Sequence, residues 1–268
     1  MIAVVKFGGG AITHKDKDGT LRMEAINNLC RQVAAFINED GGKVVVVHGG
    51  GSFGHPVAKR YGLKDGIKGY ESYRGVCETR QAMRNLNRAV VERLMEYGAR
   101  PFTIEPASSF ITRDGELKEY YGRIVELALK NDFTPVLHGD VVLDLGERRI
   151  SILSGDVIAS QLAIDLKAES LIYVIDVDGI YTDDPTSPEA KLIEQLDRGA
   201  IESLKLKLVR STGESSRHDV TGGVLRKLEE GWRAYAKGVS HVYFVKWCED
   251  RLLEALRGTK PVGTIIRG

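Results

Sequence analysis

The most constraining feature of the sequence is a set of short, apolar, β-branched runs, several of which end in glycine. The clearest is Lys43–His48, KVVVVH, which Gly49-Gly50-Gly51 follow directly. Continuous apolar runs of this length are typical of strands that are buried on both faces of a parallel sheet. Strands are expected at Ile2–Phe7, Lys43–His48, Arg100–Glu105, Thr134–His138, Ser170–Asp176, His241–Val245 and Gly263–Ile266.

Longer amphipathic segments separate these runs. Between Glu71 and Tyr97, for example, apolar side chains recur at every third or fourth position, which is the spacing of one helix face. The alternation of strands with helices favours an α/β fold, in which an open, mostly parallel sheet is sandwiched by helices. The expected helices are Arg22–Asn38, Glu71–Tyr97, Gly122–Lys130, Asp156–Leu166, Gly199–Lys207, Gly223–Lys237 and Asp250–Leu256.

One segment departs from this alternation. Val141–Leu145 and Arg149–Leu153 alternate apolar and polar side chains around a Gly-Glu-Arg-Arg turn, which predicts an antiparallel hairpin. No linker rich in Ser, Pro or Gly divides the chain. We therefore expect one continuous domain with two functional halves, 1–166 and 167–268.

Glycine-bearing turns follow several of the expected strands. In an open α/β sheet, ligands bind beyond the carboxyl ends of the strands. Glycine lets the backbone approach a ligand closely, and N–H groups at a helix start favour anions. Four such turns at one edge predict a site for an anion with several phosphates. The turns are Gly8–Gly10, Gly49–Gly51, Ser154–Asp156 and Asp219–Gly223.

A dinucleotide site is an alternative explanation of one of these turns. Gly49, Gly51 and Gly54 match the pattern G-x-G-x-x-G. That pattern requires an acidic residue about 20 positions further on, at the end of a second strand. Asp65 and Glu71 lie near that distance, but no strand pattern precedes them. NAD is therefore disfavoured. The G-x-x-x-x-G-K-[ST] motif is absent, which excludes a P-loop kinase.

The charge balance narrows the classes of partner. The 38 basic and 37 acidic side chains leave a net charge of +1, which gives no reason to expect nucleic acid or an anionic membrane. Positive charge for a phosphate site must be local, and Lys6, Lys15 and Lys227 lie beside the glycine turns.

No apolar run reaches the roughly 18 residues of a membrane span. The three cysteines are widely separated and odd in number, which predicts a reduced, cytoplasmic protein. The histidines lack metal-ligand spacing, so no protein-bound metal is expected.

Six segments together resemble the amino acid kinase superfamily, and they occur in the expected order: KFGGGAITHK, HGGGSFGH, HGDVV, ILSGD, DVDGIYTDDP and DVTGG. His55, the last residue of HGGGSFGH, is typical of the isopentenyl phosphate kinase group. Fosfomycin kinases have a similar loop and are the alternative, followed by superfamily kinases of UMP or amino acids and by a non-enzymatic nucleotide sensor. The first segment departs from the usual pattern of the superfamily at two places. It has Gly10-Ala11 where GGS is commoner, and it has His14 where an acidic residue before the lysine is commoner.

The resemblance implies the amino acid kinase fold, with the hairpin over the acceptor site, and an activity. The protein would phosphorylate isopentenyl phosphate to isopentenyl diphosphate with ATP, Mg²⁺ being carried by the nucleotide. It would do so as a cytoplasmic homodimer in isoprenoid biosynthesis by the alternative mevalonate pathway. The half formed by 1–166 would bind the phosphate acceptor, and the half formed by 167–268 would bind ATP.

The resemblance also implies roles for individual residues. Lys6 and Lys227 would hold the ATP phosphates, Lys15 would stabilise charge on the transferred group, and Asp156 would orient the lysines or simply cap its helix. Backbone N–H groups would bind the β- and γ-phosphates at Gly8, Gly9, Gly10 and Gly51. Further contacts to the nucleotide would come from Asp176, Asp178, Gly179 and Gly222. The acceptor phosphate would bind at Gly50, His55 and Gly155. Its apolar tail would meet Val76, Met83 and Ile152, although Val76 and Met83 lie on an apolar helix stripe of the kind that usually belongs to a core.

Overall fold

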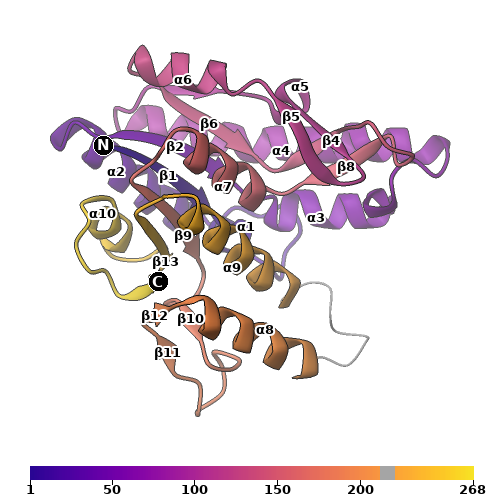
Figure 1. Cartoon of the computed structure of the whole chain (residues 1–268). Coiled ribbons are helices and arrows are strands. Elements are labelled where there is room, and N and C mark those ends of the chain that lie inside the picture. Colours follow the sequence, from indigo (N-terminus) through magenta and orange to yellow (C-terminus); the bar gives the residue numbers. More distant parts are fainter. Residues whose placement is uncertain (212–220) are drawn as a thin grey trace.

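The computed structural model describes residues 1–211 and 221–268, and it has a central eight-stranded sheet with helices on both faces (Figure 1). The strand order is β12-β14-β13-β9-β1-β2-β6-β3, and every neighbouring pair is parallel except β13 with β14. This confirms the expected open, mostly parallel α/β sheet. Its strands are β1 Ile2–Phe7, β2 Lys43–His48, β3 Pro101–Thr103, β6 Thr134–His138, β9 Ser170–Ile175, β12 Gln195–Leu196, β13 His241–Lys246 and β14 Gly263–Ile266.

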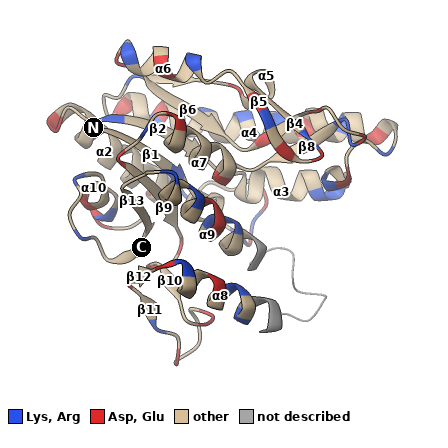
Figure 2. Cartoon of the chain, viewed as in Figure 1, with Lys and Arg blue, Asp and Glu red and all other residues tan. Residues whose placement is uncertain are grey.

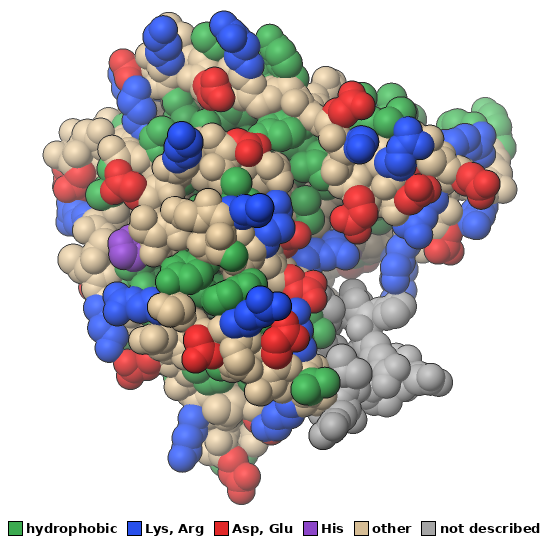
Figure 3. Space-filling model, viewed as in Figure 1, with side chains coloured by type: hydrophobic (Ala, Val, Ile, Leu, Met, Phe, Trp, Pro, Cys, Tyr) green, Lys and Arg blue, Asp and Glu red, His purple; other side chains and the backbone are tan. Residues whose placement is uncertain are grey.

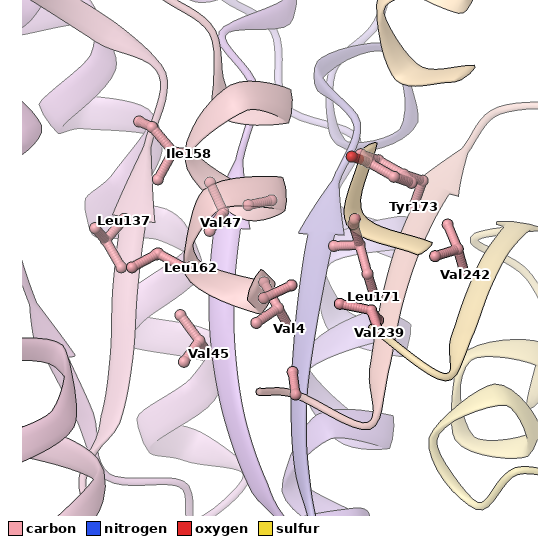
Figure 4. Close-up of a cluster of buried hydrophobic side chains, with 14 of the residues drawn as sticks. Val4, Val45, Val47, Leu137, Ile158, Leu162, Leu171, Tyr173, Val239 and Val242 are labelled. Atoms are coloured by element: carbon pink, nitrogen blue, oxygen red, sulfur yellow. The ribbon is translucent and has the colours of Figure 1, made fainter. Parts of the chain in front are cut away.

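The two faces of the sheet carry separate hydrophobic cores, because successive side chains of a strand point to opposite faces. In β1, Val4 belongs to one core, whereas Ala3 and Val5 belong to the other. Figure 4 shows the first core, where Ile158 and Leu162 of a covering helix meet the sheet. The first core is covered by α6 Arg123–Lys130, α7 Gly155–Asp165, α8 Arg198–Ser211 and α9 Thr221–Ala236. The second is covered by α2 Met23–Glu39, α4 Tyr70–Glu96 and α10 Arg251–Leu256.

A second, four-stranded sheet lies beside α3 and α4 at the right of Figure 1, in the order β5-β4-β7-β8. Its strands β7 Asp140–Asp144 and β8 Ile150–Leu153 form the antiparallel hairpin that the sequence predicts. The other two strands, β4 Phe110–Arg113 and β5 Glu116–Tyr120, were not expected from the sequence. Their FITR and ELKEY segments are short and rich in charge, so they lack the apolar pattern of a strand buried on both faces.

Two helices begin where the sequence indicated only glycine turns. They are α1 Gly9–Ile12 and α3 Gly51–Arg60, each immediately after a central strand. The remaining short elements are α5 Pro106–Ser109, η1 Leu63–Asp65, and the pair β10 Ile180–Tyr181 and β11 Leu192–Ile193. Both glycine-opened helices therefore present their first backbone N–H groups at the carboxyl edge of the sheet.

Charges of both signs are distributed over the whole molecule. Figure 2 shows basic and acidic side chains on the same helices and loops, and Figure 3 shows them interspersed over the visible surface. This pattern agrees with the expectation that any anion site draws on local charge. Within residues 1–211 and 221–268, no helix has the length and apolar character needed to cross a membrane.

Candidate active site

The two glycine-opened helices meet at the centre of the carboxyl edge. A Cβ atom built on Gly9 would lie 2.2 Å from the backbone nitrogen of Gly51, and one built on Gly49 would lie 2.8 Å from the nitrogen of Gly9. Gly51 also has a φ of +48°, which side chains rarely allow. These residues are glycines because the two backbones touch, so the first turns of α1 and α3 form one continuous surface.

Backbone N–H groups on this surface differ in their availability. The N–H of Gly8 donates to the carbonyl of Val174 at 2.8 Å, so Gly8 shapes the turn and its amide is already engaged. Gly9 and Gly10 begin α1 and Gly51 begins α3, and the first N–H groups of a helix have no intrahelical acceptor. In neither helix does the N-cap residue supply a side-chain cap, because both N-cap residues are glycines. Of the four glycines expected to bind ATP phosphates, three are therefore placed with amides suited to an anion.

Lys6, Asp156 and Lys227 form a buried cluster beside these helices. The Nζ atom of Lys6 lies 2.7 Å from Oδ1 of Asp156, and Nζ of Lys227 lies 3.3 Å from its Oδ2. The side chains of Lys6 and Asp156 are 5% and 6% exposed, so water screens this pair weakly. Asp156 belongs to the first turn of α7, where Ser154 is the capping residue. The structure thus pairs Asp156 with both lysines, one on each carboxylate oxygen.

Burial and mutual charge shift the titration of this cluster. Burial lowers the pKa of Lys6 to about 8, although the charge of Asp156 acts in the opposite direction. Burial alone would raise the pKa of Asp156, but the charges of Lys227 and Lys6 outweigh it and hold that pKa below its usual value. The carboxylate stays ionised at neutral pH and is paired with the buried ammonium group of Lys6 and the partly buried one of Lys227.

Lys15 reaches the same edge from the segment that follows α1. Its Nζ lies 2.5 Å from Oδ2 of Asp176, at the carboxyl end of β9, and its side chain is 64% exposed. A Cβ built on Gly10 would lie 2.9 Å from Cε of Lys15. The structure thus brings Lys15, Gly10 and Asp176 together, and the lysine is close to the first turn of α1.

The residues expected to bind the acceptor phosphate lie on α3 and at the start of α7. Gly50 is the N-cap of α3, and His55 is an exposed residue one turn into that helix. Gly155 opens α7, and a Cβ there would lie 3.0 Å from the carbonyl oxygen of His48, so the helix start packs closely on the end of β2. Gly50, His55 and Gly155 therefore belong to two helix starts at the same sheet edge.

The three residues expected to bind the apolar tail separate into two groups. Val76 and Ile152 are half-buried and pack against one small hydrophobic cluster formed by Ala58, Leu63, Val141 and Ile150. Met83 is 2% exposed, and its Sδ would lie 2.7 Å from a Cβ on Gly54 and 3.0 Å from one on Gly50. Met83 thus supports α3 from beneath, whereas Val76 and Ile152 lie where α4 meets the hairpin.

The residues expected beside adenine and ribose are engaged with their surroundings. Arg251 donates to Oδ1 of Asp178 at 2.6 Å, and this hydrogen bond lowers the pKa of the carboxyl. A Cβ on Gly179 would lie 2.6 Å from Oγ1 of Thr264, so Gly179 lets its loop pack on β14. Gly222 is the second residue of α9, but its surroundings lie outside the described part of the structure. Arg251 was not singled out from the sequence, because no local pattern connects it to Asp178.

A second polar cluster lies against α4, where Glu105, His138 and Asp140 are close enough together to hold a metal ion. Arginines already neutralise its carboxylates. Arg80 Nε lies 3.5 Å from Oδ2 of Asp140, and Arg84 Nε lies 3.4 Å from Oε2 of Glu105. A cation here would have to displace these guanidinium groups from the carboxylates.

Comparisons with known proteins match this arrangement. The model of the amino acid kinase family matches residues 1–246. The chain is 32% identical over 236 residues to the isopentenyl phosphate kinase of Methanocaldococcus jannaschii, covering 85% of this chain and 86% of that protein. It is 36% identical over 245 residues to the isopentenyl phosphate kinase of Arabidopsis thaliana, covering 84% and 73%.

The fold comparison points the same way. The structure is similar to the crystal structure of the T. acidophilum isopentenyl phosphate kinase product complex, with a TM-score of 0.79, 29% identity and 100% of both chains covered. The family model and these relatives match most of the chain, so the chain belongs to the amino acid kinase family, within which it stands with the isopentenyl phosphate kinases.

Proposed function

We propose that this chain transfers the γ-phosphate of ATP to the phosphate of isopentenyl phosphate. A terminal phosphate oxygen of the acceptor forms a bond to the γ-phosphorus, the bond from that phosphorus to the β-phosphate oxygen breaks, and isopentenyl diphosphate and ADP leave. The observation that carries the proposal is the contact between two glycine-opened helices beside a buried Lys–Asp–Lys cluster, in a chain related to isopentenyl phosphate kinases.

The chemistry needs positioning and charge neutralisation more than a base. Both reactants are anions, and the acceptor oxygen is already ionised at neutral pH. Lys6 and Lys227 would hold the ATP phosphates while Asp156 keeps their ammonium groups fixed. Lys15 would stabilise the transferred group, and one well-placed donor contributes ~3 kcal/mol to the transition state.

The backbone would complete the phosphate sites. The free N–H groups of Gly9, Gly10 and Gly51 would bind the β- and γ-phosphates, where the positive end of each helix dipole favours an anion. The start of α7 at Gly155, together with Gly50 and His55 of α3, would bind the acceptor phosphate. Since the starts of α1 and α3 touch, the two phosphates would lie end to end.

Mg²⁺ would arrive with ATP, held mainly by phosphate oxygens and water. The carboxylates of Asp156 and Asp176 at this edge are both paired with lysines, which fits a metal that the nucleotide carries. When bound, the metal supplies further neutralisation of phosphate charge.

Substitution of His55 by alanine should raise the KM for isopentenyl phosphate about tenfold or more and leave the KM for ATP within about twofold. A phosphate dianion raises the pKa of a neighbouring imidazole and makes it a cationic donor, and a hydrogen bond to a charged group contributes about 1.5–3 kcal/mol. Steady-state kinetics with each substrate varied would measure this. His241→Ala, at the amino end of β13, is the control. Unchanged KM values for both substrates in His55→Ala would remove His55 from the site.

Val76→Ala should increase the relative kcat/KM for a ten-carbon prenyl phosphate over isopentenyl phosphate. Each buried CH₂ contributes about 0.8 kcal/mol, so room for one more methylene corresponds to about a fourfold change. Met83→Ala should instead lower the melting temperature, because Met83 supports α3. Competition assays with mixed chain lengths would test both variants. If the chain-length preference shifted only in Met83→Ala, then Met83 and not Val76 would line the pocket for the apolar tail.

One assay separates the proposed function from its alternatives. The protein is incubated with ATP and Mg²⁺ and, in separate reactions, isopentenyl phosphate, fosfomycin, UMP or an amino acid, and the products are identified by phosphorus NMR. We expect ADP and a diphosphate from isopentenyl phosphate. A faster reaction with fosfomycin would favour the alternative kinase, and turnover of none of these would favour a nucleotide sensor.

We also propose that the enzyme acts in the cytoplasm as a homodimer, with 1–166 binding the acceptor and 167–268 binding ATP. The open sheet edge at β3 supports a second copy there, because Phe102 is 38% exposed and its ring lies 5.5 Å from that of Phe133. Light scattering on the purified protein would give the oligomeric state.

A further inference from the structure

Residues 13–21, which we call the Lys15 segment, form a small loop that carries Lys15. Its base is closed by an antiparallel bridge between Thr13 and Leu21 and by a 3.0 Å hydrogen bond from the N–H of His14 to the carbonyl of Thr20. Thr13 at the base and Gly19, which precedes Thr20, both bond to the same residue of α3, Ser52. One residue in the first turn of α3 therefore anchors this loop through both of its backbone groups.

The N–H of Ser52 is one of the helix-start amides that have no intrahelical acceptor. It donates to Oγ1 of Thr13 at 3.0 Å, and the Thr13 hydroxyl in turn donates to the carbonyl of Gly9 at 2.8 Å. Thr13 is fully buried. Since α3 has no side-chain cap of its own, Thr13 caps it from another segment, and the same hydroxyl connects α3 to the first residue of α1.

The carbonyl of Ser52 also lacks its regular helical partner. In a regular helix it would accept the N–H of the residue four positions later, but that residue is Pro56, which has no N–H. The carbonyl accepts the N–H of Gly19 instead, at 2.9 Å. Pro56, a poor residue for a helix interior, thus frees an acceptor for the Lys15 segment.

We propose that Thr13 and Pro56 are positioning residues: they direct both backbone groups of Ser52 to the Lys15 segment and so fix Lys15 relative to the acceptor helix α3. The inference rests on the proposed function. In-line transfer requires the γ-phosphate, the acceptor and the stabilising ammonium group in one geometry, and a misplacement of about 1 Å can reduce the rate about 100-fold.

Kinetics of three threonine variants test the positioning role of Thr13. Thr13→Val removes the hydroxyl at nearly constant volume, and it should lower kcat tenfold or more while both KM values stay within about threefold. Thr13→Ser should restore most of kcat, because it keeps the hydroxyl. Thr112→Val is the matched control, since Thr112 is also fully buried and its hydroxyl bonds to Asp144 and Ser151. It should lower the melting temperature but keep kcat.

Hydrogen exchange tests the same contacts without reference to activity. Thr13→Val should speed exchange of the Ser52 amide at least tenfold, and Pro56→Ala should speed exchange of the Gly19 amide, because the new N–H competes for the Ser52 carbonyl. Pro56→Ala should not lower the melting temperature, since alanine is the better helix former, yet its kcat should fall.

The outcomes are distinguishable. If the wild type fails to phosphorylate isopentenyl phosphate, the proposed function fails, and the exchange measurements still decide whether Thr13 and Pro56 hold the segment. If the wild type is active but Thr13→Val keeps wild-type kcat, or loses it no more than Thr112→Val, the positioning role is wrong. Unchanged exchange of the Ser52 amide in Thr13→Val would overturn the role of Thr13. Unchanged exchange of the Gly19 amide in Pro56→Ala would overturn the role of Pro56.

Discussion

Asparagine in place of Asp156 should lower kcat/KM for ATP roughly 10²–10³-fold at neutral pH, the size of the loss expected when a preorganised charge is removed from a phosphate site. The carboxylate is bonded to Lys6 and Lys227 at once, and it is almost wholly buried. An asparagine has nearly the same shape but no charge, so two ammonium groups would be left close together without their counter-ion.

The same substitution should change the pH dependence. Lys6 binds phosphate in its charged form, which exists below its pKa, so kcat/KM for ATP in the wild type should fall as the pH rises through about 8. The charge of Asp156 raises the pKa of Lys6 against the effect of burial. Without that charge the pKa of Lys6 falls further, and the alkaline decline in kcat/KM should begin at a lower pH.

Stability supplies the control for this experiment. Removal of one partner from a buried ion pair costs roughly 3–5 kcal/mol, whereas an exposed pair contributes at most about 1 kcal/mol. Glu92, which pairs with Arg88 on the surface of α4, is the matched exposed carboxylate. Glu92→Gln should keep wild-type activity and melting temperature. If Asp156→Asn retained both the rate and the alkaline decline of the wild type, the carboxylate would not be the partner that fixes the lysines.

Most of the sheet could be predicted from the sequence, because buried parallel strands have a strong local signal. The seven expected strands correspond to central strands, with differences of a few residues at their ends. The two glycine-opened helices could not be predicted in this way. GGAI is a single turn, and GSFGHPVAKR contains two glycines and Pro56, all with low intrinsic helix propensity. These helices depend on contacts with each other and with Thr13, which only the fold reveals.

The residues of the candidate site likewise fall into those that the sequence identified and those that only the structure shows. The resemblance to the superfamily identified Lys6, Asp156 and Lys227, and the structure brings them into contact. It did not identify Arg251, whose partner Asp178 is far away in the sequence. Nor could it separate Met83 from Val76, since both belong to the same helix face; the difference arises because Gly50 and Gly54 of α3 lie against the Met83 sulfur.

Alanine in place of Gly9 should lower kcat roughly 100-fold, with a smaller effect on the KM for either substrate. The new Cβ would lie 2.2 Å from the nitrogen and 2.6 Å from the Cα of Gly51, and neither atom is the end of a flexible side chain. The first turns of α1 and α3 would therefore have to move apart, and a displacement of about 1 Å between reacting groups is enough for a loss of this size. Steady-state kinetics with both substrates would measure it.

Gly199→Ala is the matched control, because Gly199 also lies in the first turn of a helix, α8, and a Cβ there would make only an ordinary contact of 3.4 Å with Asp197. Alanine is the better helix former at both positions, so local helix propensity cannot explain a loss in Gly9→Ala alone. A Gly9→Ala enzyme with wild-type kcat would mean that the two helices need not touch for transfer. It would then follow that the donor and acceptor phosphates are aligned by the lysines alone, without the shared backbone surface.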